Sequence, residues 1–242
     1  VWAWGWNAYG QLGDGTLTNR SYPTEVVAGA CGGCGTYLNN IIQIAAGSYF
    51  VSALRADGTV WTWGYGGFES LGYGSNTNSK TPVQVCAVGT CASHLTGVSQ
   101  IAVREELELA LVNGNVVSWG LNADGGLGNG TSTGDTATTG ANIPVKVCAP
   151  GTGPGCVTYL SNIRNIAVGY QTGYAVTGAG SMYSWGANAY GEMGLGTTCA
   201  IVTTECTTAA DDVPNQVLAG ADSGCGTYLC NVHMIASGQF YV

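Results

Sequence analysis

The sequence predicts an all-β fold built from propeller-type blades, and three observations lead to this prediction. A phrase centred on Trp-Gly occurs four times, at Trp4, Trp63, Trp119 and Trp185, with spacings of 59, 56 and 66 residues, and we expect these four tryptophans to form the core of the repeats. Short runs of alternating apolar residues, separated by glycine turns, fill each repeat and are typical of strands. No segment keeps apolar residues at positions i, i+3, i+4 and i+7, so we expect no helix.

The composition indicates a folded protein that avoids polyanions. Charged residues are 8% of the 242, while 7 Trp and 13 Tyr supply large apolar area, which argues against disorder. The net charge is −8 with only six scattered basic residues, so a nucleic-acid partner is not expected. No apolar run approaches the roughly 20 residues of a membrane span.

Each repeat opens with a strand and a glycine-rich turn. The four versions are "VWAWGWNAYGQLGDGT", "VWTWGYGGFESLGYGS", "VVSWGLNADGGLGNGT" and "MYSWGANAYGEMGLGT". A Pro with Val three residues later follows, as in Pro23 and Val26, and then come a cysteine loop and a recurring Tyr-Leu. The segment "VSALRADGTVWTWG" predicts a hairpin with an Asp-Gly turn. Repeats of roughly 1–59, 60–115, 116–181 and 182–242 would stack, because one small sheet cannot bury both faces.

The two ends of the sequence fall inside repeats. Val1 corresponds to Val60, and Val242 corresponds to Val51. Unpaired strand edges are prone to association. We therefore expect a segment of a longer chain, or a subunit completed by neighbours, within a larger ring or a stacked array.

Ten cysteines form five near-neighbour pairs: Cys31/Cys34, Cys86/Cys91, Cys148/Cys156, Cys199/Cys206 and Cys225/Cys230. This pattern predicts structural disulfides in an extracellular or cell-surface protein. Two alternatives are weaker. Zinc needs four converging ligands, and a redox role for "CGGC" lacks a thioredoxin-like βαβ setting.

The remaining candidate sites are few. His94 and His233 belong to no Ser-His-Asp constellation, so we expect no enzyme, no cofactor and no metal site, and a packing role for His94. The acidic runs 104–108 and 210–212 are expected to be solvated. Asn19 and Asn129 match the N-glycosylation pattern in accessible loops. Trp6 is a candidate for contact with a ligand or a neighbouring subunit, with core filling as the alternative.

The repeat resembles the regulator of chromosome condensation repeat. The residues that carry the resemblance are Ile44, Ala45, Ala46, Gly47, Ala53, Leu54, Asp57, Gly58, Trp63, Gly64, Asn7, Gly10, Gln11, Leu12, Gly13 and Pro23. The resemblance implies a β-propeller, usually of seven blades, that mostly acts as a binding platform. The eukaryotic founder exchanges nucleotide on a small GTPase, and secreted bacterial relatives include an inhibitor of β-lactamase.

Three departures from the family pattern stand out. Phe50 occupies a position that is often His, and Glu69 replaces the glycine equivalent to Gly10, so that turn should differ. The cysteine loops lie outside the common pattern and argue against a nuclear exchange factor.

Two functions fit these observations. The first is an extracellular structural or assembly protein that associates with itself, in filaments or on a surface. The alternative is a secreted binding module whose loops on one propeller face hold a protein or a glycan. Polymers would indicate the first function and a discrete particle the second.

Overall fold

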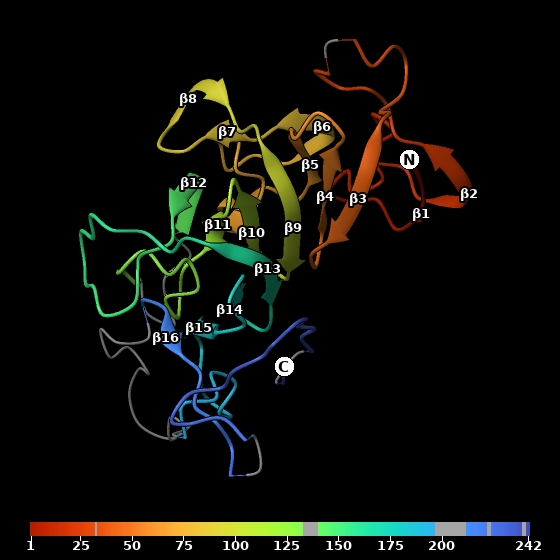
Figure 1. Cartoon of the computed structure of the whole chain (residues 1–242). Helices are drawn as coiled ribbons and strands as arrows, with labels where there is room; N and C mark the ends of the chain where they lie inside the picture. Colours follow the sequence, from red (N-terminus) through yellow and green to blue (C-terminus); the bar gives the residue numbers. More distant parts are fainter. Residues whose placement is uncertain (32, 133–139, 197–211, 222–223, 239–240) are drawn as a thin grey trace.

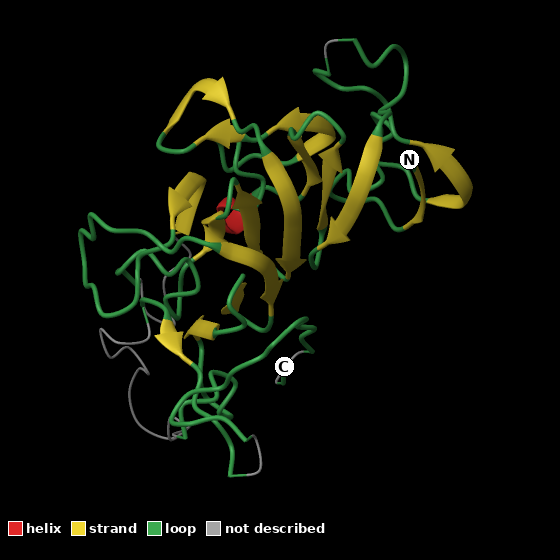
Figure 2. Ribbon diagram, in the orientation of Figure 1, coloured by secondary structure: helices red, strands yellow, loops and turns green. Residues whose placement is uncertain are grey.

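The computed structural model describes residues 1–31, 33–132, 140–196, 212–221, 224–238 and 241–242. The fold is all-β, as predicted, and its one helical element in the described residues is the short 3₁₀ turn η1 (Gly67–Glu69). Figure 2 shows strands joined by loops throughout. This turn of three residues does not change the predicted all-β class.

Three four-stranded antiparallel blades follow one another along an arc (Figure 1). The first blade contains, in spatial order, β3 (Ile41–Ala46), β4 (Phe50–Arg55), β5 (Val60–Gly64) and β6 (Ser79–Gln84). The second contains β9 (Val98–Arg104), β10 (Leu107–Val112), β11 (Asn115–Leu121) and β12 (Gly140–Lys146). The third contains β13 (Ile163–Val168), β14 (Thr172–Thr177), β15 (Met182–Gly186) and β16 (Asn215–Gln216). Two small sheets accompany them, β1 (Trp2–Gly5) with β2 (Arg20–Glu25), and β7 (Cys86–Ala87) with β8 (Thr90–His94).

The predicted hairpin at the Asp-Gly turn is confirmed. Strands β4 and β5 pair with Leu54 opposite Val60. Gly58 has φ 78°, a conformation that costs glycine little. The Asp57 carboxylate accepts hydrogen bonds from the backbone N–H and the hydroxyl of Thr59, which closes the turn.

The blades pack through the tryptophan of each Trp-Gly phrase. Trp63, Trp119 and Trp185 are at most 1% exposed. Each indole is covered by the preceding repeat, through the glycine that ends the Gly-x-Leu-Gly turn. In the second repeat this turn reads Glu-Ser-Leu-Gly, and its last glycine does the same. A Cβ built on Gly13 would lie 2.8 Å from the Trp63 indole, and on Gly72 it would lie 2.7 Å from Trp119. Glycine is required there because no larger residue fits against the ring.

Amide side chains on the inner strands clamp neighbouring blades together. The strands β3, β9 and β13 lie side by side (Figure 1). Gln43 Nε2 donates to the Ile101 carbonyl at 2.7 Å, and the Ile101 N–H donates to Gln43 Oε1 at 3.0 Å. Gln100 makes the same two bonds with Ile166, both at 3.1 Å. A primary amide offers the donor and acceptor of a peptide group, so each glutamine fixes the register of the next blade.

One predicted core residue is not in the core. Trp4 is 62% exposed, although it occupies the same position as Trp63. It lies in the two-stranded sheet β1–β2, and no described segment covers it as the turn at Gln11 and Gly13 covers Trp63. The sequence phrase marks a tryptophan that the preceding blade must bury, and here that cover is missing from the described residues.

Candidate functional site

A buried asparagine shapes the turn that follows the Trp-Gly strand. Asn7 Oδ1 accepts from the Leu12 N–H at 2.9 Å. The equivalent bonds from Leu127 to Asn122 and from Met193 to Asn188 are both 3.1 Å. This bond is made inside the turn, and in the first repeat the two residues between Asn7 and Gly10 reach the surface, with Ala8 exposed and Tyr9 half-buried.

The second repeat builds this turn differently, as its glutamate predicted. Gly66 replaces the asparagine, and the Ser70 hydroxyl donates to the Tyr65 carbonyl at 2.7 Å instead. Phe68 and Glu69 adopt φ of 54° and 64°, a region that bulky residues rarely occupy. Such strain is typical of functional segments, and it brings Phe68 beside Tyr65.

Five aromatic rings gather here from three separate loops. We call Trp6, Tyr9, Tyr49, Tyr65 and Phe68 the aromatic cluster. Ring centroids are 5.3 Å apart for Trp6–Tyr9, 5.7 Å for Trp6–Tyr49, 5.4 Å for Tyr9–Tyr49, 4.9 Å for Tyr9–Tyr65, 6.2 Å for Tyr49–Tyr65 and 6.1 Å for Tyr65–Phe68. These separations fall in the range of favourable aromatic pairs.

The backbone holds the aromatic cluster in place while leaving part of it open to solvent. The Tyr65 N–H donates to the Tyr49 carbonyl at 2.9 Å, which ties two of the loops together. The Tyr9 N–H donates to Gln11 Oε1 at 3.0 Å. Trp6 remains 49% exposed and Tyr49 44% exposed. The candidate contact residue Trp6 therefore lies in a preformed aromatic surface, not in a core.

An acidic turn adjoins the aromatic cluster on the next blade. Glu105 and Glu106 connect β9 to β10, and the Glu105 carbonyl accepts from the Ser48 N–H at 3.2 Å. Burial raises the pKa of both carboxyl groups, and the charge of Glu105 raises that of Glu106 further. Hydrogen bonding from the Ser48 hydroxyl opposes this rise in the Glu106 pKa, but its effect is smaller than that of burial. We call the aromatic cluster together with Ser48, Glu105 and Glu106 the turn face.

The expectation that residues 104–108 are solvated is wrong at Glu108. Its side chain is fully buried on β10, opposite Trp119. Ser52 Oγ donates to Glu108 Oε1 at 2.5 Å, and Oε2 has no partner among the described residues. Burial raises the pKa of Glu108 well above its usual range. Alternation along the strand could have indicated this, since a residue opposite the core tryptophan faces the neighbouring blade.

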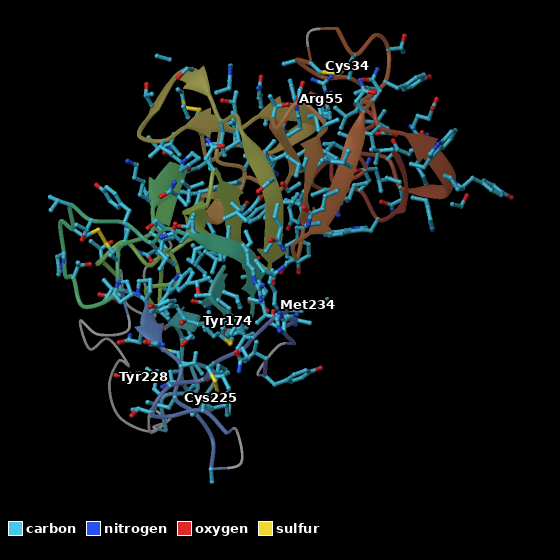
Figure 3. All side chains as sticks on the ribbon, viewed as in Figure 1. Cys34, Arg55, Tyr174, Cys225, Tyr228 and Met234 are labelled. Carbon is cyan, nitrogen blue, oxygen red and sulfur yellow. A yellow bond between two sulfur atoms is a disulfide. The ribbon has the colours of Figure 1, made fainter. Side chains whose placement is uncertain are left out.

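Four of the five cysteine pairs are joined as disulfides in the structure. Their Cα atoms are 5.5 Å apart for Cys31–Cys34, 4.7 Å for Cys86–Cys91, 5.9 Å for Cys148–Cys156 and 5.7 Å for Cys225–Cys230. Cys199 and Cys206 lie outside the described residues. Figure 3 places Cys34 and Cys225 in loops at opposite ends of the molecule. The Cys86–Cys91 bridge joins the small strands β7 and β8, and the other three bridges lie in loops.

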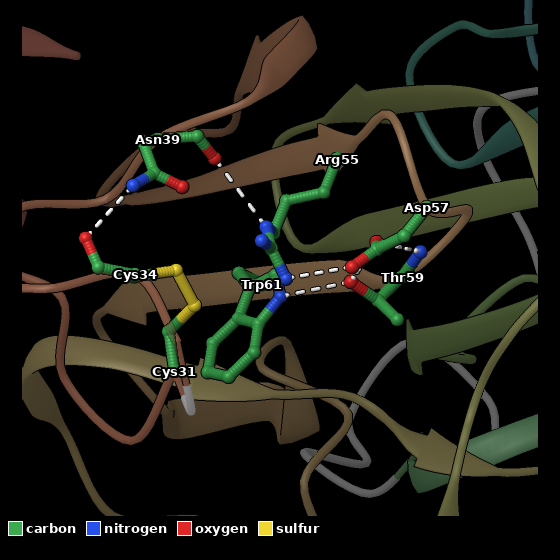
Figure 4. The surroundings of a disulfide bond; sticks show 7 residues. All are labelled: Cys31, Cys34, Asn39, Arg55, Asp57, Thr59 and Trp61. Atoms are coloured by element: carbon green, nitrogen blue, oxygen red, sulfur yellow. Dashed lines mark hydrogen bonds and ion pairs between the residues drawn. A yellow bond between two sulfur atoms is a disulfide. The ribbon is translucent and has the colours of Figure 1, made fainter.

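The surroundings of Cys31 and Cys34 favour a structural bridge (Figure 4). Both residues pack in a core cluster with Trp61 and are at most 7% exposed. Asn39 Nδ2 donates to the Cys34 carbonyl at 2.8 Å, and Arg55 bonds both the Asn39 carbonyl and the Asp57 carboxylate. Thiol exchange needs an accessible sulfur, so this burial argues against a redox role.

The other predicted residues are not members of the turn face. Asn19 is exposed, and its Oδ1 accepts from the Asn7 N–H at 2.9 Å. Asn129 is half-buried and its Oδ1 accepts from Thr131. The packing expected for His94 is not seen, because the side chain is exposed on β8.

His233 is also exposed, beside Arg164, and of the run 210–212 only Asp212 is described, where it is buried. The described part of the chain contains no group of three or more His, Cys, Asp and Glu placed to hold a metal ion. It also contains no helix long and apolar enough to cross a membrane.

The comparisons with known proteins agree with this geometry. The "Regulator of chromosome condensation (RCC1) repeat" profile matches residues 1–54, 57–103 and 179–242. The chain is 32% identical over 198 residues to the ultraviolet-B receptor UVR8 of Arabidopsis thaliana. This match covers 81% of the chain and 39% of that protein. It is 31% identical to the human E3 ubiquitin-protein ligase HERC2 over 203 residues, which covers 82% of the chain and 4% of that protein.

Solved structures share the fold at lower sequence identity. Human WBSCR16 superimposes with a TM-score of 0.62 and 21% identity, covering 89% of this chain and 46% of that one. Prp20p of Saccharomyces cerevisiae gives 0.64 and 21%, covering 92% and 47%. The chain spans less than half of each of these proteins. With matching repeats over most of its length and the same blade architecture, the chain belongs to the regulator of chromosome condensation (RCC1) repeat family.

Proposed function

We propose that this chain is a binding module that holds a protein partner on the turn face. The observation that carries the proposal is the aromatic cluster, where Trp6 and Tyr49 remain about half exposed although five rings pack together. Rigid aromatic groups that are already packed lose little entropy on binding, and Trp and Tyr are enriched at binding hot spots.

Relatives offer support by analogy. One solved structure of Prp20p is described with its binding to Gsp1p and histones, and another shows Kap60 bound to yeast RCC1. Those partners belong to those proteins. For the present chain they support only the general idea that a blade array of this family presents a protein-binding face.

Three further parts of the proposal rest on the sequence. We take the chain to be non-catalytic, because its two histidines are exposed on separate segments, one of them on β8. We place it outside the cell or on its surface, because ten cysteines in close pairs suit an oxidising compartment. Self-association into filaments is the weaker proposal, supported by the exposed Trp2 and Trp4 of β1.

The proposed function is tested by selecting ligands without assuming their chemistry. A random-peptide display library is panned against the intact, oxidised chain, and each selected peptide is measured against the variants Trp6→Ala and Tyr49→Ala. Peptides that lose binding to these variants but keep binding to Tyr22→Ala, an 81% exposed tyrosine on β2, support the turn face. If the selected peptides bind Trp6→Ala and Tyr49→Ala as tightly as the parent chain, the proposed function is wrong.

A further inference from the structure

We propose that the segment bound by the turn face is basic, with lysine or arginine side chains that lie between the aromatic cluster and the carboxylates of Glu105 and Glu106. This inference rests on the proposed function and names the chemistry of the partner. It combines two independent observations, the arrangement of the rings and the charge on the adjoining turn.

The rings present electron-rich surfaces in a stepped arrangement. Trp6 meets Tyr9 at 82° and Tyr49 at 68°, and Tyr9 meets Tyr49 at 65°. A sugar ring stacks on one broad, flat face, whereas a surface broken into steps suits a compact ammonium or a narrow guanidinium. Cations are attracted to aromatic faces within about 6 Å of the ring centroid. The geometry of these three rings therefore favours a cation over a neutral glycan.

The acidic turn supplies the charge that such a cation needs. The backbone N–H of Ser48, the residue before Tyr49, donates to the Glu105 carbonyl at 3.2 Å, which joins the acidic turn to the aromatic cluster. The turn that carries both glutamates is therefore held against the loop of Tyr49, and both residues are half-buried. A half-buried carboxylate has lost part of its hydration. The attraction of an incoming cation offsets part of the free energy that this loss costs.

Neighbouring carboxylates extend the negative charge, and Arg104 offsets part of it. The charges of Glu105, Asp124 and Glu106 all act on Tyr170 of the next blade, although burial is the larger cause of its raised pKa. The basic group that acts on this turn is Arg104, adjacent to Glu105 in sequence. With a net charge of −8 over the chain, the molecule as a whole attracts a basic partner, and the acidic turn would attract it locally.

The probe is the capped peptide acetyl-(Arg-Gly)4-amide, with (Gln-Gly)4 and (Glu-Gly)4 of the same length as comparisons. Binding to the intact, oxidised chain is measured by titration calorimetry at 0.1 M NaCl. We expect saturable binding of the arginine peptide and at least about tenfold weaker binding of the other two. Equal binding of the arginine and glutamine peptides would overturn the inference.

Matched variants place the binding on the turn face. Glu105→Gln/Glu106→Gln should weaken the arginine peptide about 5- to 10-fold, and Tyr49→Leu about 3-fold. Glu25→Gln and Tyr22→Leu, both on β2, should change it less than about 2-fold. If Glu25→Gln weakens binding as much as the double variant, the attraction is diffuse and the inference is wrong. Thermal unfolding of every variant verifies that each one is folded.

A glycan is the rival outcome. Chitohexaose is titrated in parallel with the peptides. If chitohexaose binds through Trp6 and Tyr49 and the arginine peptide does not bind there, the proposal of a basic partner is wrong. Likewise, display peptides that need the turn face without enrichment in Lys or Arg would overturn the basic partner and leave the proposed function standing.

Discussion

The sheet β1–β2 and the three complete blades use the same sequence phrase with opposite results. Trp63, Trp119 and Trp185 are at most 1% exposed, while Trp4 is 62% exposed. The Ile44 side chain on β3 is likewise exposed, whereas its equivalents Ile101 and Ile166 are buried under the preceding blade's glutamine clamp. Burial in this fold is therefore a property of the interface between repeats, as in other repeat proteins.

The largest expected effect separates the two regions directly. Trp185→Ala should lower the free energy of unfolding by about 3–5 kcal/mol, because it removes a fully buried indole from the interface between the second and third blades. Trp4→Ala should change it by less than about 0.5 kcal/mol. Urea unfolding followed by circular dichroism gives both values. Comparable losses of stability for the two variants would contradict the idea that the tryptophan is stabilising only where the preceding blade covers it.

A buried acid tests the same interface through pH. Glu108 is fully buried between blades and its pKa is raised by burial. The folded state then keeps a proton that the unfolded chain releases near pH 4.3, so this group's contribution is greatest at acidic pH and is lost as pH rises toward the folded pKa. Glu108→Gln should therefore be more stable than the parent by about 1–3 kcal/mol at pH 8, with little difference at pH 4.

The control for this experiment lies in the uncovered sheet. Glu25→Gln on β2 should leave the pH dependence of unfolding unchanged, since no neighbouring blade packs over that sheet in the described residues. A parent chain whose stability rises between pH 5 and pH 8 as much as that of Glu108→Gln would contradict the assignment of Glu108 as a protonated interface residue.

Local, repeated signals in the sequence predicted much of the fold. The Trp-Gly phrase and the Asp-Gly turn each specify a strand or a turn by themselves, so the blades and the β4–β5 hairpin followed from them. The different turn at Glu69 was also predicted. Trp4 was misplaced because its burial depends on another blade, and Glu108 because its charge outweighed its position opposite Trp119.

The candidate site was harder to predict than the fold. Trp6 was singled out because the other repeats carry different residues at its position. The rest of the aromatic cluster comes from loops far apart in sequence, and only the stacking of blades brings Tyr9, Tyr49 and Tyr65 together. The sequence does place an aromatic residue at the equivalent positions Tyr9 and Phe68 of two successive repeats. That pattern carries no information on how the loops lie relative to one another.

A smaller effect tests the glutamine clamps that join the blades. Gln100→Met should lower the free energy of unfolding by about 2 kcal/mol, because it leaves the Ile166 N–H and carbonyl without their partner. Asn165→Met is the matched control, since Asn165 occupies the equivalent position on β13 and its buried Oδ1 has no partner in the described residues. That variant should be neutral or slightly more stable in urea unfolding.

The smallest expected effect asks whether the clamp can be extended by one methylene. By repeat position, Ile235 stands to Asn165 as Ile166 stands to Gln100. Asparagine is one methylene shorter than glutamine, so Asn165→Gln should let the amide reach the Ile235 backbone and raise the free energy of unfolding by about 0.5–1 kcal/mol. Native-state hydrogen exchange should show slower exchange at the Ile235 N–H in this variant. If Asn165→Gln and Asn165→Met stabilise equally without that protection, relief of the unpaired oxygen, and not a new clamp, explains the gain.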